Sequence, residues 1–325
     1  MNDVLSLARS MAETGNAAGG VAILEKASEA GDRDAAAELG FWLLRGDRIA
    51  RDVPRARAFL GCAAALGSEE AISLEIAFSA NGSGGKPDWA AALALLRQGA
   101  TRYAYLKDQL DLIEGLGLDE AGYPREASAG KLIDPGLQMI HYSPFLSPRE
   151  CQHIANVAVG TLGPSTVFDP ATGRQVANPV RTSDGTVIGP AQEDLVVQAV
   201  LRRVAKATET DVAQGESLSV LRYSPGQEYR PHFDAIARTR NNRIKTVLMY
   251  LNDSYVGGQT AFPDLGLAID PKAGDALVFD GLNADGSVNT LSRHAGLPIT
   301  RGTKWVATRW IRARPFDPWT AGRGE

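Results

Sequence analysis

Two of the four histidines in this 325-residue chain stand where they could bind a metal ion. His232 and Asp234 form an H-x-D motif at the end of a segment, 229–234, that is predicted to be extended. Residues two apart in a strand project from the same face, so the imidazole and the carboxylate can converge on one ion. His294 lies 60 residues beyond Asp234 and can complete the set if the intervening strands form a roll.

Two histidines and one carboxylate on one side of an ion leave other positions open, which is typical of non-haem Fe(II) oxygenases. A structural zinc site generally has four ligands, often cysteines, and the sequence around these residues contains no cysteine. On the strand predicted over 303–311, alternation places four side chains on one face: Lys304, Val306, Thr308 and Trp310. A lysine inside a closed roll requires an anion, which a dicarboxylate co-substrate would supply.

Five blocks of the second half, in order, resemble the catalytic domain of the prolyl 4-hydroxylases, which are 2-oxoglutarate- and Fe(II)-dependent dioxygenases. The blocks are 221–234, 245–253, 257–263, 271–280 and 292–312, and the resemblance extends over 137–315. It implies a double-stranded β-helix, or jelly roll, with supporting helices. It also implies that O2 and 2-oxoglutarate are consumed, that succinate and CO2 are released, and that a substrate C–H bond is hydroxylated.

The resemblance also implies roles for individual residues. His232, Asp234 and His294 would bind Fe(II), and Lys304 would pair with the far carboxylate of 2-oxoglutarate. Two further positions match groups that hydrogen-bond this co-substrate: Tyr223 and Thr260. Positions that match the proline-peptide groove are Tyr229, Arg243 and Trp310, and the positions that match a mobile loop over bound peptide are Arg181, Thr182 and Ser183.

The first half, residues 1–115, has a different character and repeats with a period of 36 residues. Positions that align under this shift include Leu24, Leu60 and Leu96, and also Gly46 with Gly82 and Asp52 with Asp88. Helices are expected over 34–44, 53–66, 69–79 and 89–115. The pattern resembles Sel1-like repeats, which are relatives of the tetratricopeptide repeat and stack into an α-solenoid that binds proteins. The alternative is a plain helical bundle.

The sequence therefore predicts three parts: a helical repeat domain over 1–115, a linker over 116–135 and an oxygenase domain over 136–325. The linker contains Gly, Pro and charged residues without periodicity. In the third part, Ser147 and Glu150 form a capping box that should begin a helix ending at Val159.

Composition excludes several classes of protein. Apolar residues make up 44% and charged residues 22%, as in ordinary globular proteins, and a net charge of −4 does not favour nucleic acid as a partner. The longest apolar stretch, 89–96, is far short of the roughly 20 residues that a membrane span needs. We expect a cytoplasmic protein without membrane association, and a homo-oligomer is compatible with the sequence. Five basic residues between Arg230 and Lys245 could attract the co-substrate or an acidic partner, or could form a solvated loop.

Three functions follow as hypotheses. The first is hydroxylation of prolyl residues in a protein or peptide that the repeats recruit, with ascorbate as reductant. The second is the same chemistry on a non-prolyl residue or a small molecule. The third is a non-catalytic, metal-binding adaptor, which Lys304 disfavours because a bare metal site needs no inward cation.

Overall fold

The computed structural model describes residues 2–169, 174–237 and 239–320, and they form two compact units. The helical unit contains the chain up to Gly122 together with Pro190–Gln198. The sheet-rich unit contains Tyr123–Gly189 and the chain from Ala199 onward. Within the described residues, no helix is both long enough and apolar enough to cross a membrane.

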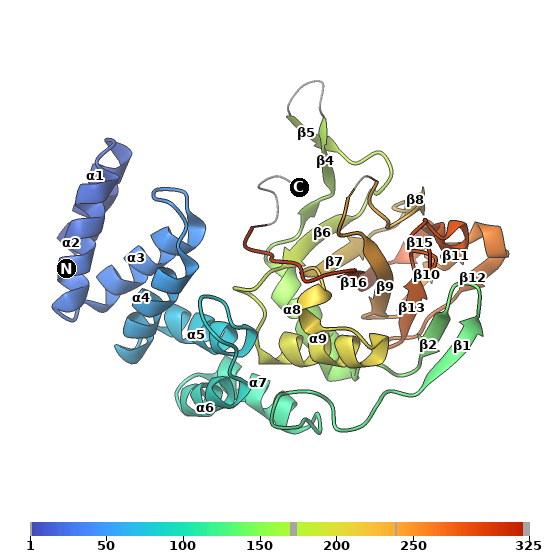
Figure 1. Cartoon of the computed structure of the whole chain (residues 1–325), viewed down its shortest axis with the longest axis horizontal. Helices are drawn as coiled ribbons and strands as arrows, with labels where there is room; N and C mark the ends of the chain where they lie inside the picture. The colour runs from blue at the N-terminus through green and yellow to red at the C-terminus, as the bar shows by residue number, and fades with distance from the viewer. Residues whose placement is uncertain (1, 170–173, 238, 321–325) are drawn as a thin grey trace. The chain divides into compact units, whose positions relative to one another are not determined.

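The helical unit is built from consecutive helices that pack on their neighbours in the chain (Figure 1, blue to teal). They are α1 Asn2–Glu13, α2 Ala17–Glu29, α3 Arg33–Arg45, α4 Val53–Ala65, α5 Glu69–Asn81, α6 Trp89–Ala100 and α7 Ala104–Glu114. The single helix expected over 89–115 is wrong, because the chain divides into α6 and α7. The amide and the hydroxyl of Thr101 both donate to the carbonyl of Gln98, which ends α6 there.

Helix ends in this unit recur with the 36-residue period. Gly46 and Gly82 end α3 and α5 in the left-handed region, with φ of 72° and 78°. Asp52 and Asp88 begin α4 and α6, and each carboxylate accepts a hydrogen bond from the backbone amide three residues later. Glycine at the C-terminal end and aspartate at the N-terminal end are the residue types that these positions favour.

The contact between α3 and α4 depends on a glycine. A Cβ atom placed on Gly40 would lie 2.7 Å from Cγ of Leu60, which is fully buried. A side chain at position 40 would therefore push the two helices apart. Gly61, in the neighbouring helix α4, has no such restriction, because the nearest atom to its Cβ position is 3.9 Å away.

The sheet-rich unit contains two facing sheets. The large sheet has the order β1 Gly130–Asp134, β2 Met139–Tyr142, β13 Ala276–Asp280, β9 Arg243–Tyr250, β16 Lys304–Arg312, β7 Leu218–Tyr223, β6 Asp184–Ile188 and β3 Gly163–Pro164. The small sheet has the order β12 Leu267–Ile269, β11 Thr260–Phe262, β14 His294–Gly296 and β8 Tyr229–His232. Two two-stranded sheets complete it: β10 Tyr255–Gly257 with β15 Ile299–Gly302, and β4 Thr166–Asp169 with β5 Arg174–Ala177.

Apolar side chains from both sheets form one core. Leu248, Phe279 and Val306 come from the large sheet, whereas Phe262 comes from the small sheet, and its ring meets that of Phe279 edge-on at 5.1 Å. Two sheets that enclose such a core agree with the jelly roll expected from the sequence.

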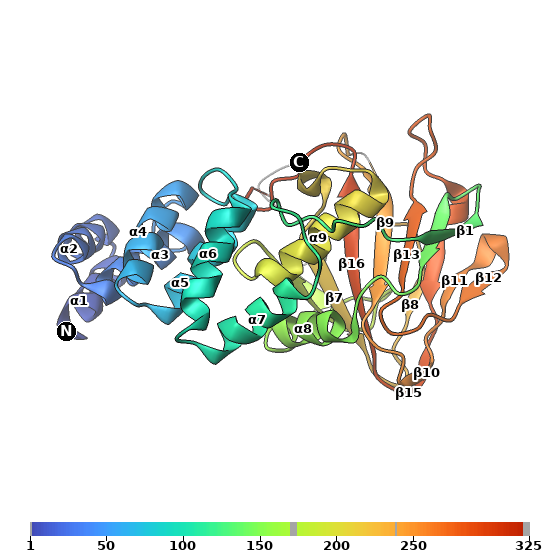
Figure 2. The ribbon, with the colours of Figure 1, turned by 90° about the horizontal axis from the view of Figure 1, so that it is seen from below.

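Two helices lie beside the large sheet in Figure 2: α8 Pro148–Val159 and α9 Leu195–Thr208. Helix α8 begins at the predicted capping box, in which the Ser147 hydroxyl accepts from the Glu150 amide and the Glu150 carboxylate accepts from the Ser147 amide. Arg203 of α9 forms a buried ion pair of 2.7 Å with Glu150. The box therefore also fixes a carboxylate that joins the two helices.

Two segments differ from the predicted division of the chain. The last residues of the expected linker, Gly130–Asp134, form strand β1, which pairs with β2. Most of its residues are exposed, so the strand lacks the alternation of apolar and polar residues from which a strand is predicted. Pro190–Gln198, which lies within the range predicted for the oxygenase domain, packs with the helical unit.

The packing at Gly40 predicts opposite effects for two matched substitutions. Gly61→Ala should raise the free energy of unfolding by about 0.5–1 kcal/mol, because alanine is the better helix former. Gly40→Ala should lower it by about 1–3 kcal/mol through overpacking against Leu60. Chemical denaturation followed by far-ultraviolet circular dichroism measures both, and equal shifts for the two variants would contradict this packing.

Candidate metal centre and co-substrate pocket

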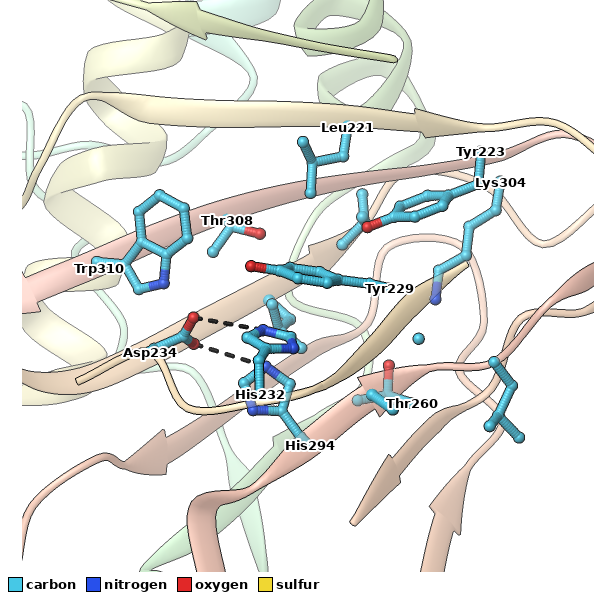
Figure 3. A pocket seen from close by; sticks show the side chains of 15 residues that line it. Leu221, Tyr223, Tyr229, His232, Asp234, Thr260, His294, Lys304, Thr308 and Trp310 are labelled. Atoms are coloured by element: carbon cyan, nitrogen blue, oxygen red, sulfur yellow. Dashed lines mark ion pairs between the residues drawn. The ribbon is translucent and has the colours of Figure 1, made fainter. Parts of the chain in front are cut away.

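One strand pairing brings the two distant histidines together. In the small sheet β14 runs antiparallel to β8, and His294 lies directly opposite His232. Asp234 follows β8 by two residues, and its carboxylate oxygens lie 3.6 Å from Nε2 of each histidine. Figure 3 shows the three side chains pointing toward one another.

Backbone carbonyls fix the orientation of both imidazoles. Nδ1 of His232 lies 2.9 Å from the carbonyl oxygen of Arg230, and Nδ1 of His294 lies 2.9 Å from that of Ser292. A carbonyl can only accept, so each Nδ1 carries the proton and each Nε2 presents its lone pair to the centre. Burial also lowers the pKa of His294, which favours the neutral, metal-binding form.

Asp234 is held as a carboxylate from several sides. Burial alone would raise the pKa of its carboxyl group, whereas the facing imidazoles of His294 and His232 and a hydrogen bond from Thr246 lower it, and the net direction is down. The Thr246 hydroxyl donates to Oδ2 at 2.7 Å, and Thr246 is itself buried. The backbone oxygen of Asp234 accepts from Arg243 at 3.3 Å.

The three residues fit a divalent iron. One ligand atom from each of His232, Asp234 and His294 lies within 4.8 Å of the others, and these residues are the one such group of metal-binding side chains in the described part of the chain. Nε2 of His232 is buried and has no hydrogen-bond partner, as a nitrogen reserved for a metal would be. Two imidazoles and one carboxylate on one side are the donor set of the Fe(II) oxygenases. The predicted convergence is confirmed.

Lys304 lies in the same pocket and is only 4% exposed. Its ammonium donates to the carbonyl oxygen of Gly258 at 2.6 Å and lies 5.3 Å and 5.9 Å from the ring centres of Tyr250 and Tyr255. Burial lowers the pKa of Lys304 to about 8. The predicted alternation along β16 is also found, since its inward residues line the pocket: Lys304, Val306, Thr308 and Trp310.

Tyr223 and Thr260 accompany Lys304 from opposite sheets. Tyr223 is the cross-strand partner of Lys304 in the large sheet, and Thr260 lies on β11 of the small sheet. Both side chains are buried and line the pocket. Burial raises the pKa of Tyr223, so its hydroxyl stays protonated and can donate to a carboxylate. The structure thus brings together the three residues expected at 2-oxoglutarate.

Of the three residues expected in a substrate groove, two line the pocket of the metal centre and one does not. Tyr229 stacks on His232 with ring centres 3.5 Å apart, and Trp310 lines the same pocket. Arg243 does not line it. Its guanidinium lies 3.8 Å from the ring centre of Trp310 and donates to Glu216 at 2.6 and 2.8 Å. Arg243 therefore contacts the Trp310 ring while its charge is paired with Glu216.

The expected loop over the substrate runs beside β8. Arg181 bridges to Tyr229 through the backbone, and its guanidinium lies 5.6 Å from the Tyr229 ring. Ser183 is buried, with its hydroxyl 3.1 Å from that of Ser165, and it hydrogen-bonds Tyr223. Arg181 therefore contacts the metal-site tyrosine, and Ser183 supports a co-substrate residue.

The basic flank between Arg230 and Lys245 is largely paired. Arg230 contacts Glu228 at 3.1 Å, and Lys245 pairs with Asp280. Arg243 is engaged by Glu216, as described above. Arg238 lies outside the described residues. Whether the flank attracts an anion or is a solvated loop stays open.

Three contributors to the site were not expected from the sequence. Thr246 and Tyr250 share the inward face of β9 with Leu248. A hydroxyl group on the inward face of an otherwise apolar strand is the sequence pattern that could have indicated both residues. Gly258 offers the Lys304 ammonium a backbone carbonyl, which no side-chain pattern encodes. Its φ of 70° lies in the left-handed region, and a Cβ there would meet Ile299 at 2.3 Å.

Residues 218–312 match the model of the 2OG-Fe(II) oxygenase superfamily. Together with the two-sheet fold and the His-Asp-His centre, this match defines the protein as an oxygenase that uses Fe(II), 2-oxoglutarate and O2. Similar proteins from Arabidopsis thaliana identify the branch. Probable prolyl 4-hydroxylase 7 is 37% identical over 199 residues, which span 54% of this chain and 63% of the relative.

Two further Arabidopsis relatives are similar over more of their length. Prolyl 4-hydroxylase 1 is 36% identical, with 52% of this chain and 67% of the relative covered. Probable prolyl 4-hydroxylase 3 is 32% identical, and the match covers 60% of this chain and 79% of the relative. The chain belongs to the prolyl 4-hydroxylase family.

Solved structures give local similarity. The viral collagen prolyl hydroxylase of Paramecium Bursaria Chlorella virus-1, in its 2OG complex, is 27% identical with a TM-score of 0.45, and the match covers 54% of this chain and 96% of that one. A Sel1 repeat protein from Oxalobacter formigenes is 22% identical with a TM-score of 0.30, and the match covers 34% of this chain and 88% of that one.

The hydrogen bond from Thr246 to Asp234 predicts a metal-binding defect. Thr246→Val removes the hydroxyl and should weaken Mn(II) or Fe(II) binding by about 10- to 100-fold, because groups that orient metal ligands contribute this much. Thr208→Val is the matched control, since among the described residues its buried hydroxyl bonds within or beside α9. Calorimetric titration of the metal-free protein measures the change, and unaltered affinity in Thr246→Val would refute the role.

Proposed function

We propose that this protein hydroxylates prolyl residues of a protein or peptide, using Fe(II), O2 and 2-oxoglutarate. The observation that carries the proposal is the placement of Lys304 in the same pocket as His232, Asp234 and His294. A buried cation beside a three-ligand metal centre suits a dicarboxylate that binds the metal at one end and the ammonium at the other. The Arabidopsis relatives support the prolyl substrate, because their names describe prolyl 4-hydroxylases.

The chain's own residues hold and orient the reactants in this proposal. His232, Asp234 and His294 would bind the iron, which supplies O2 activation when bound. Lys304 would pair with the far carboxylate, and Tyr223 and Thr260 would donate hydrogen bonds to it. Apolar neighbours exclude water from this end of the pocket: Leu221, Leu248 and Val306. The substrate would enter on the side of Tyr229 and Trp310, where one C–H bond must be brought to the metal.

The helical unit is proposed to be a Sel1-like α-solenoid that recruits the substrate protein. The recurring helix ends at Gly46 and Gly82 and at Asp52 and Asp88 support a repeat of 36 residues. Such units bury their apolar faces by stacking on one another. We also propose ascorbate as the reductant, because the family chemistry implies it. A cytoplasmic location and a homo-oligomer stay predictions from the sequence.

The proposal is tested by product analysis. The full chain, with Fe(II), ascorbate and 2-oxoglutarate, is incubated with proline-containing peptides and, separately, with a cell lysate. We expect succinate to accumulate above the peptide-free level, and mass spectrometry to find oxidised proline in the modified peptides. Succinate without any oxidised proline would favour the second hypothesis, the same chemistry on another substrate. Lack of succinate in every reaction would exclude the hypothesis that the protein is an enzyme of this class. The His294→Ala variant serves as the inactive control.

The pKa of Lys304 predicts how co-substrate binding depends on pH. The group is charged below its pKa of about 8 and neutral above it, and only the charged form pairs with a carboxylate. The dissociation constant for 2-oxoglutarate should therefore be flat below pH 8 and should rise about tenfold per pH unit above it. Anaerobic calorimetry of the Mn(II)-loaded protein between pH 7 and 9.5 measures this.

Lys304→Arg is the control for this titration, because a guanidinium stays charged throughout this range. Its affinity for 2-oxoglutarate should change little with pH, whatever its absolute value. Lys304→Ala should lose most 2-oxoglutarate turnover at every pH. A wild-type profile that matched the Lys304→Arg profile would contradict the assignment of the pH dependence to Lys304.

A further inference from the structure

The distal metal ligand, His294, follows a polar segment to which the sequence assigns no role. After β13 the chain forms a small, exposed hairpin in which Leu282 pairs with Val288, and it then enters the 3₁₀ helix η3, Thr290–Ser292. Asn289 lies between the hairpin and η3 and is only 6% exposed. A buried amide side chain is costly unless its groups find hydrogen-bond partners, so its contacts indicate what it holds in place.

Asn289 forms hydrogen bonds through both its side chain and its backbone. Its Nδ2 donates to the carbonyl of Gly136 at 3.0 Å, in the turn that joins β1 to β2. Its Oδ1 accepts from the Leu291 amide at 3.1 Å and thereby caps η3. The backbone amide donates to the carbonyl of Gly281 at 3.0 Å, and the backbone carbonyl accepts from the Ser292 amide at 3.0 Å. Asn289 therefore joins the start of η3 to the turn between two strands of the large sheet.

The last residue of η3 supplies the carbonyl that orients His294. The oxygen of Ser292 accepts from Nδ1 of His294 at 2.9 Å. The direction of this carbonyl follows the conformation of η3, which depends on its cap because so short a helical turn has few hydrogen bonds of its own. The other histidine, His232, is oriented by the carbonyl of Arg230, which lies within β8 itself. A strand thus supplies one orienting carbonyl, and a capped turn supplies the other.

We infer that Asn289 is a positioning residue for the distal metal ligand: its side chain holds η3 against the turn between β1 and β2, and so aims the Ser292 carbonyl at Nδ1 of His294. This inference rests on the proposed function, because it concerns the metal centre which that function requires. It also gives β1, which the sequence placed in a linker, a part in building the metal centre, since its turn provides the anchor for Asn289.

Asn289→Ala removes both side-chain hydrogen bonds. On the metal-free full chain, calorimetric titration with Mn(II) should show a dissociation constant raised about tenfold, the lower end of the range for groups that orient metal ligands. Asn283→Ala is the matched control. Asn283 lies in the same hairpin, and its exposed amide donates to the Ser287 hydroxyl and the Val288 carbonyl, so its loss should leave the Mn(II) affinity unchanged.

The metal-free protein offers a readout that a loss of stability alone would not change. Nitrogen-15 NMR distinguishes the two neutral tautomers of an imidazole, and in the wild type His294 should carry its proton on Nδ1. In Asn289→Ala both tautomers should be populated, because the Ser292 carbonyl is no longer held in place. The His294 signals are assigned by their absence from the spectrum of His294→Ala.

Asn289→Ser separates this role from general packing. A serine hydroxyl can still accept from the Leu291 amide and cap η3, so this variant should keep the Nδ1 tautomer of His294 and recover most of the Mn(II) affinity that Asn289→Ala loses. The inference would be overturned by an Asn289→Ser variant that binds as weakly as Asn289→Ala, or by an Asn289→Ala variant with wild-type affinity and a single tautomer.

The failure of this inference differs from the failure of the proposed function. A wild-type protein that binds no Mn(II) would refute both. Tight wild-type binding together with an unchanged Asn289→Ala affinity would refute only the role of Asn289.

Discussion

The antiparallel pairing of β8 with β14 is the constraint on which the metal centre depends. It places His294 opposite His232 and so brings together residues that are far apart in the chain. A slip of one residue would turn His232 to the other face of the sheet. In a regular strand, Tyr229 and His232 would also point to opposite faces, because they are three residues apart. The pairing shifts between His294 and Gly296, and this irregularity lets Tyr229 and His232 line the same pocket.

The sequence predicted the parts of the site that strand alternation and residue chemistry encode. The H-x-D motif and the inward face of β16 are of this kind, because a period of two determines which side chains share a face. The carbonyls that orient the two histidines could not be predicted, since any residue supplies a carbonyl. The pairing of Arg243 with Glu216 joins the start of β9 to the segment before β7, which lie on either side of β16, and only the fold brings them together. The place of Arg243 in a substrate groove stays a prediction, and what the structure adds is its contact with the Trp310 ring.

The helical half shows the same division between local and tertiary information. Asp52 and Asp88 begin helices where the repeat pattern places them, because a cap needs only residues within one turn. The interruption of the last helix at Thr101 and the strand β1 within the expected linker depend on weaker signals. Strand β1 is defined by its pairing with β2 rather than by its own exposed side chains. Pro190–Gln198 belongs to the helical unit because of how it packs, and the 36-residue period of the sequence does not indicate such packing.

Lys304 is the residue whose placement is hardest to explain by stability alone. A buried ammonium loses its hydration. One neutral carbonyl and two aromatic rings compensate for this loss only in part, as the lowered pKa of Lys304 indicates. Within the described residues it forms no ion pair. An apolar side chain of similar length would pack there without this penalty, since replacing buried charges by apolar groups is often neutral or stabilising. The fold therefore holds a cation at a cost to its own stability, and an anionic ligand that enters the pocket recovers that cost on binding. This coupling makes the far carboxylate, rather than the metal-binding end, the part of the co-substrate that the protein fold itself selects.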